Sequence, residues 1–254
     1  MSNKLDDITL YYYPKGEEAK IFTLKHNVIS DLYIQHLNRY KPPKTSRISV
    51  ELANEDFIRG YFGSILLVNA KFDKSKYWNL IDSDKNKMIL ETIHRTAMLC
   101  ADKYGWDIDV FANAYQKVIQ ANFIYKIELT RKLSRDRKHK ASILVEKNEK
   151  DAPISALIYD KENNLIKKVE LLRTFNWTGF HIPIVLNFKW FDNNSFGLSI
   201  CKGQLVLKAN LNKEKPEINI NPKDISREEL EGKLREITYK EFNNQKDIVD
   251  WINK

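Results

Sequence analysis

The sequence predicts an α+β protein: an antiparallel β-meander sheet packed by a central αα-hairpin, with strands before the hairpin and helices after the meander. Three observations predict this class. Apolar residues recur with a period of 3.6 through residues 86–118, and the period changes to two after Ala121. Polar turn sequences such as "KENN" and "DNNS" then separate a series of short apolar runs. At 254 residues, of which 43% are hydrophobic, the chain can bury a sizeable core.

The first 80 residues are predicted to form short strands and one helix. Residues 8–13 and 19–25 have the composition of two strands joined by a turn at Pro14–Gly16. A helix over residues 28–39 should end before the paired prolines that follow it. Two more strands are predicted, one with the sequence "RISVELA" and one with "GSILLVNAKF", the second as a buried run without alternation.

The central helical hairpin is the strongest local prediction. Its first helix has an apolar stripe at the spacing i, i+4, i+8 and i+11, formed by Ile89, Ile93, Ala97 and Cys100. Gly105 suits the left-handed position after this helix. Asp107 can cap the second helix, and Trp106 and Phe111 occupy the two positions of a hydrophobic staple.

The meander and the C-terminal region complete the predicted organisation. Residues 123–211 contain about seven short strands with polar turns, typical of an antiparallel meander. Residues 212–222 are polar and contain proline, which indicates a linker, and a capping box at Ser226 and Glu229 begins the C-terminal helices. The predicted divisions are therefore 1–80, 81–211 and 212–254, with one single domain as the alternative.

Motifs for catalysis or metal binding are not found in the sequence. It contains no phosphate-binding loop, no nucleophile elbow and no zinc-protease motif. The two cysteines, Cys100 and Cys201, lie far apart, and the five histidines are isolated. We therefore expect no catalytic residues, no cofactor and no metal site. The alternative is an enzyme of unrecognised class whose groups meet only in space, for which Glu51, Glu55 and Asp56 are the carboxylates to consider.

The chain ends and apolar runs predict a cytoplasmic protein without a membrane segment. The N-terminal residues lack the basic and apolar regions of a secretory signal. The longest aliphatic run, Ile65–Val68, is far too short to cross a bilayer.

One local segment accounts for much of the positive charge. The chain carries a formal charge of +8, and residues 121–210 alone contain 16 basic and 9 acidic residues. Within them, "RKLSRDRKHK" joins two predicted strands and places six basic residues beside one acidic residue. The candidate binding surface consists of Arg131, Lys132, Arg135, Arg137, Lys138, His139 and Lys140.

Three interpretations of this basic segment stay open. It can be a solvated hairpin tip, a docking surface for an acidic protein, or a contact for nucleic acid. Six cations could neutralise several phosphates. Base recognition, however, usually adds aromatic side chains for stacking, and residues 131–140 contain none.

Residues 88–210 also resemble a family of bacterial proteins. The run "HRTAMLCADKYGWDIDVFANAYQKVI", followed by a basic hairpin and a meander with polar turns, looks like small α+β proteins encoded beside bacterial polymorphic toxins. The resemblance implies a cytoplasmic immunity protein that neutralises a toxin by occlusion and has no catalytic residues. We therefore expect a non-catalytic protein-binding module whose partner is an acidic protein, such as a toxin domain. The alternative is a nucleic-acid-binding accessory protein that uses the basic hairpin 131–140.

Overall fold

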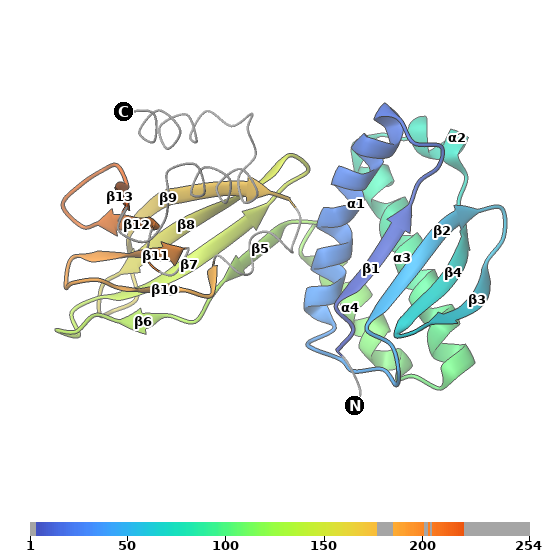
Figure 1. Ribbon diagram of the computed structural model, residues 1–254, viewed down its shortest axis with the longest axis horizontal. Helices are drawn as coiled ribbons and strands as arrows, with labels where there is room; N and C mark the ends of the chain where they lie inside the picture. The colour runs from blue at the N-terminus through green and yellow to red at the C-terminus, as the bar shows by residue number, and fades with distance from the viewer. Residues whose placement is uncertain (1–3, 177–184, 201–202, 204, 221–254) are drawn as a thin grey trace. The chain divides into compact units, whose positions relative to one another are not determined.

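The computed structural model describes residues 4–176, 185–200, 203 and 205–220 (Figure 1). These residues form four helices and thirteen strands in three sheets, which confirms the α+β class. The chain divides into two compact units, residues 1–125 and 126–254. The division between the units falls where the apolar period changes from 3.6 to two. The predicted boundaries are near residues 80 and 211 instead.

The first unit contains a mixed four-stranded sheet. Its strands lie in the order β1 (Asp7–Tyr11), β2 (Arg47–Ala53), β4 (Ile65–Lys71) and β3 (Phe57–Phe62). Strands β1, β2 and β4 are parallel, and β3 is antiparallel to β4. The predicted buried run in β4 alternates instead: Leu66 and Val68 are buried, whereas Ile65 and Leu67 are only half-buried. The reason is that the helices cover one face of this sheet (Figure 1).

The helices of the first unit are α1 (Glu17–His36), α2 (Lys74–Trp78), α3 (Asp82–Tyr104) and α4 (Ile108–Gln120). The strand predicted at residues 19–25 is wrong, because these residues lie in α1. The buried side chains of α1 include Phe22, His26, Ile29 and Tyr33, at the spacing i, i+4, i+7 and i+11. The helical period therefore begins well before residue 28, and a short window of alternating residues concealed it.

The predicted helical hairpin corresponds to α3 and α4. Gly105 ends α3 with φ at 66°, in the left-handed region. The Asp107 carboxylate accepts a hydrogen bond from the Asp109 N–H at 3.1 Å, and the rings of Trp106 and Phe111 lie 6.1 Å apart. Both helices belong to the first unit, where they pack with α1. The predicted place of these helices is instead against the meander.

A polar contact joins the three long helices. The Tyr33 hydroxyl lies 3.0 Å from Nδ1 of His94 and donates to the Phe111 carbonyl at 3.3 Å. The His94 ring also lies 4.6 Å from the ring of Tyr115. Burial lowers the pKa of His94, so the neutral imidazole is the form that this environment favours. His94 is thus a histidine at the edge of the core.

The second unit contains two antiparallel sheets. One has the strands β5 (Tyr125–Glu128), β7 (Lys140–Lys147), β8 (Asp151–Tyr159) and β9 (Leu165–Phe175), with β6 (Lys132–Leu133) paired to β7. The other has the strands β10 (Phe188–Trp190), β11 (Ser195–Ile200), β12 (Leu205–Asn210) and β13 (Glu217–Ile220). The predicted meander is therefore divided between two sheets, and β13 lies inside the predicted linker. The predicted C-terminal helices lie outside the described residues.

Burial explains the division of the meander. Strand β11 lies against β8, and β12 lies against β9. Five apolar side chains of these strands have no exposed surface: Ile154, Ala156, Phe196, Leu198 and Leu207. A single flat sheet would leave such side chains in water, at a cost of about 1.5–3 kcal/mol for each large one.

Replacing Phe111 with alanine should destabilise the first unit by about 3–5 kcal/mol, because the ring is fully buried and its removal leaves a cavity. Chemical denaturation of the purified variant measures this loss. Phe62→Ala is the matched control, since Phe62 is 75% exposed and its loss should change stability by about 0.5 kcal/mol or less. Equal effects of the two substitutions would contradict the place of Phe111 in the core.

The stability of the first unit should fall between about pH 7 and about pH 5. Burial lowers the pKa of His94, and burial together with nearby Lys117 lowers the pKa of His36. The unfolded chain therefore binds more protons than the folded chain in this range, and protonation favours unfolding. Denaturation curves at both pH values measure the effect. His94→Gln should lose less stability on acidification than the wild type, and an identical loss would refute the contribution of His94.

Candidate functional site

The basic segment forms an ordered hairpin between β6 and β7. The Ser134 N–H donates to the His139 carbonyl at 2.9 Å, and the Arg137 N–H donates to the Ser134 carbonyl at 3.0 Å. Arg137 has φ at 59°, a left-handed conformation that reverses the chain direction. The hairpin thus has a closed turn rather than an open loop.

Asp136 organises this turn. Its carboxylate accepts hydrogen bonds from the Ser134 hydroxyl at 2.7 Å and from the Lys138 N–H at 3.2 Å. These two hydrogen bonds, with the Ser134 bond the larger cause, lower the pKa of Asp136. The Ser134 hydroxyl oxygen also accepts from the His139 N–H at 3.0 Å. The single acidic residue of the segment is therefore used to hold the turn.

Arg131 anchors one side of the hairpin base. Its Nε donates to the Glu128 carboxylate at 2.8 Å, and its guanidinium lies 3.7 Å from the centre of the Tyr159 ring. Burial alone would raise the pKa of Glu128, but hydrogen bonds from Arg131, Ser142 and Tyr159 lower it. The charge of Arg131 is thus compensated within the second unit.

Lys132 and Lys140 anchor the base on two other elements. The Lys132 ammonium donates to the Phe188 carbonyl at 2.7 Å and lies 4.0 Å from the centre of the Phe188 ring. The Lys140 ammonium donates to the Asn163 side chain at 2.8 Å. Both lysines therefore contact the neighbouring β10 strand or the β8–β9 turn instead of projecting freely into solvent.

Side chains of β10 and of the turn after it hold the hairpin in place. The Trp190 indole N–H donates to the Lys132 carbonyl at 2.9 Å, and the His139 ring lies 6.4 Å from the Trp190 ring. The Asp136 N–H donates to the side-chain oxygen of Asn193 at 3.3 Å. Residues more than fifty positions away in the sequence therefore hold the hairpin, and no local pattern in residues 131–140 indicates this contact.

The tip is the part of the candidate surface whose two arginine side chains have no partner in the described residues. Arg135, Arg137 and Lys138 are exposed, and neither arginine side chain forms a hydrogen bond or an ion pair within the part of the chain that the structure describes. Of the seven predicted residues, Arg131, Lys132, His139 and Lys140 belong to the anchored base. The other three present positive charge on a rigid turn. We call Arg135, Arg137 and Lys138 the basic tip.

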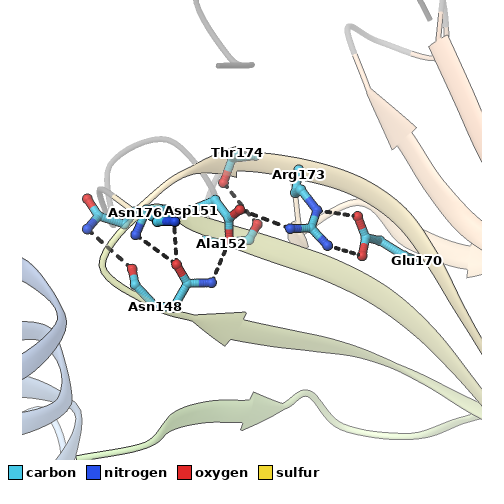
Figure 2. A network of polar contacts seen from close by, with 8 residues as sticks. Asn148, Asp151, Ala152, Glu170, Arg173, Thr174 and Asn176 are labelled. Atoms are coloured by element: carbon cyan, nitrogen blue, oxygen red, sulfur yellow. Dashed lines mark hydrogen bonds and ion pairs between the residues drawn. The ribbon is translucent and has the colours of Figure 1, made fainter. Parts of the chain in front are cut away.

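A second charged cluster lies at the β7–β8 turn and is internally satisfied (Figure 2). The Arg173 guanidinium donates to both carboxylate oxygens of Glu170, at 2.6 and 2.7 Å, and to Asp151 at 2.9 Å. The Asn148 side chain donates to the other Asp151 oxygen at 2.6 Å. Hydrogen bonding to Glu170 raises the pKa of Arg173. This cluster stabilises the ends of β8 and β9.

Two of the three carboxylates considered for acid–base chemistry, those of Glu51 and Asp56, are bound by cations, and the third, Glu55, is exposed. Glu51 pairs with Arg59 at 3.0 Å. Asp56 pairs with Arg95 at 3.0 Å and accepts from the Lys71 N–H at 2.8 Å. These interactions separate the two carboxylates into different ion pairs.

Two hollows lie near the carboxyl ends of the parallel strands β2 and β4, where ligands bind in many α/β sheets. One has a volume of about 420 Å³ beside Ala53 and Asp73, and the other, of about 450 Å³, lies along α3. Charged residues of both signs line the second hollow, including Lys87 and Glu91. The lining therefore selects no single ligand charge.

Cys100 is the cysteine that lies within the described residues. Cys100 is buried, and burial raises the pKa of its thiol to about 12, so the thiolate that reacts is disfavoured. Cys201 lies outside the described residues.

No group of three or more His, Cys, Asp or Glu side chains in the described residues is placed to hold a metal ion. None of the described helices is both long enough and apolar enough to cross a membrane.

Comparisons with known proteins return no match. No protein-family model, no curated protein and no solved structure matches the chain. The resemblance to immunity proteins stays a prediction.

Proposed function

We propose that this protein is a non-catalytic binding module that docks the basic tip against an acidic surface of a partner protein. The observation that carries the proposal is the contrast within the hairpin. The base is held by Glu128, Phe188 and Trp190, whereas the tip presents cations that have no ion-pair partner among the described residues.

Rigidity makes such a tip effective. Association costs free energy for each loop or side chain that must be ordered at the interface, and a turn already closed by Ser134 and Asp136 avoids part of that cost. The three cations of the basic tip exceed the single negative charge of Asp136, and the net positive charge attracts an acidic surface over distances of about 10 Å at moderate salt, which raises the association rate.

The environment of the aromatic rings favours a protein partner over nucleic acid. Single-stranded nucleic acids stack their bases on free aromatic faces. Phe188 is covered by the Lys132 ammonium, and Trp190 packs on Phe196 with ring centres 5.3 Å apart. Both rings are half-buried and are already engaged in contacts that hold the hairpin.

The specific form of this proposal is a cytoplasmic immunity protein that neutralises a bacterial toxin by covering its surface. Its support is the resemblance of residues 88–210 described above. Occlusion requires no catalytic group, in agreement with carboxylates that are held in ion pairs. The candidate partner is the polypeptide encoded beside this gene, and the complex should protect cells that express that polypeptide.

Reversing the tip charges tests the docking surface. The triple variant Arg135→Glu, Arg137→Glu and Lys138→Glu should keep its thermal midpoint, because no buried group loses a partner. Its association with the neighbouring-gene polypeptide, measured by stopped flow, should be slower and less dependent on salt.

A charge-matched control separates the tip from net charge. Lys15→Glu, Lys20→Glu and Lys117→Glu together change the same number of exposed lysine or arginine charges on the first unit. This variant should associate at nearly the wild-type rate. Equal slowing of both triple variants, or no complex and no protection with the wild type, would overturn the proposal.

Binding of nucleic acid is the second candidate function, favoured by the 16 basic and 9 acidic residues of the segment 121–210. We expect the wild type not to retard random DNA or RNA in a gel at about 50 mM salt. Suppose instead that the wild type retards nucleic acid, and that the tip variant retards it less, with a log–log salt slope flatter by about 2–3. Nucleic acid would then be the ligand of the basic tip.

A further inference from the structure

A second cationic cluster lies on the outer face of the β10–β13 sheet. The ammonium groups of Lys189 and Lys208 each lie 5.2 Å from the centre of the Phe191 ring. In the strand register both lysines are neighbours of Gly197, which places no side chain between them. We call Lys189, Phe191 and Lys208 the lysine–phenylalanine cluster.

The two ammonium groups of this cluster are not held in ion pairs within the described part of the chain. Glu217 is opposite Lys208 in the register, but its carboxylate binds Lys213 at 2.7 Å. The Asp192 carboxylate accepts from the Asn194 N–H at 2.7 Å. Two like charges beside one ring repel each other, and a bound anion would relieve that repulsion.

The cluster is close to the basic tip. Asn193 accepts a hydrogen bond from the Asp136 N–H in the tip turn, and Asn193 lies two residues after Phe191. The tip and the cluster are therefore on the two sides of one turn, the β10–β11 turn. A partner surface that reaches around this turn would meet cations from both.

We infer that the lysine–phenylalanine cluster extends the docking surface and binds carboxylates of the same acidic protein. This inference rests on the proposed function. The two ammonium groups lie over the Phe191 ring, so a base could stack on it only by displacing them. Carboxylates need only the exposed ammonium hydrogens, which this arrangement supplies.

Fluorescein-labelled poly-L-glutamate at low ionic strength is the probe. The double variant Lys189→Gln and Lys208→Gln should bind it about fivefold more weakly than the wild type, as expected for two lost exposed charge pairs. Lys15→Gln with Lys20→Gln is the matched control and should bind as the wild type does. Thermal midpoints of all variants should agree, because the four lysines are at least partly exposed.

The tip triple variant makes the outcomes distinguishable. If it weakens probe binding and the Lys189 and Lys208 variant does not, the inference fails while the docking function stands. If neither variant differs from the matched control, both fail. If the wild type binds single-stranded poly(dT) but not poly-L-glutamate, the surface belongs to nucleic acid, and the inference of an acidic protein is overturned.

Discussion

Burial of the apolar faces between two antiparallel sheets is the constraint on which the second unit depends. Strand β11 lies against β8 and β12 against β9, and this stacking brings β10 beside the basic hairpin. Within its own sheet, β11 comes close to β12 at Gly197, where a Cβ would lie 1.9 Å from the Leu207 carbonyl oxygen. Packing between the two sheets therefore sets the position of β10, and β10 supports the hairpin. The residues of the hairpin do not determine this packing.

This support gives the two parts of the hairpin different roles. At the base, Arg131 lies over the Tyr159 ring and Lys132 over the Phe188 ring, and these cation–π contacts stabilise the unit. At the tip, the Asp136 carboxylate holds the turn and leaves Arg135 and Arg137 exposed. The basic segment thus has two parts: the cations at its base stabilise the unit, and the cations at its tip are exposed to solvent.

Local sequence patterns correctly predicted the features that depend on local interactions. The helical pair, its glycine stop at Gly105 and the Asp107 cap follow from periodicity and capping, and the structure confirms them. The strand predicted at residues 19–25 was wrong because a short alternating window overlapped a longer helical period. The division of the meander and the Trp190 contact could not be predicted, because both depend on residues brought together only by sheet stacking. The seven candidate residues were found from charge alone, but the side-chain contacts of the folded chain separate base from tip.

Hydrogen exchange of the hairpin amides tests most directly the claim that β10 fastens the hairpin. The N–H groups of Ser134 and Arg137 should be protected in the wild type, because both donate within the closed turn. Trp190→Phe removes the indole hydrogen bond to Lys132, so protection of these two amides should fall while that of Ala156 in β8 persists. Unprotected hairpin amides in the wild type, or protection unchanged in Trp190→Phe, would contradict the account.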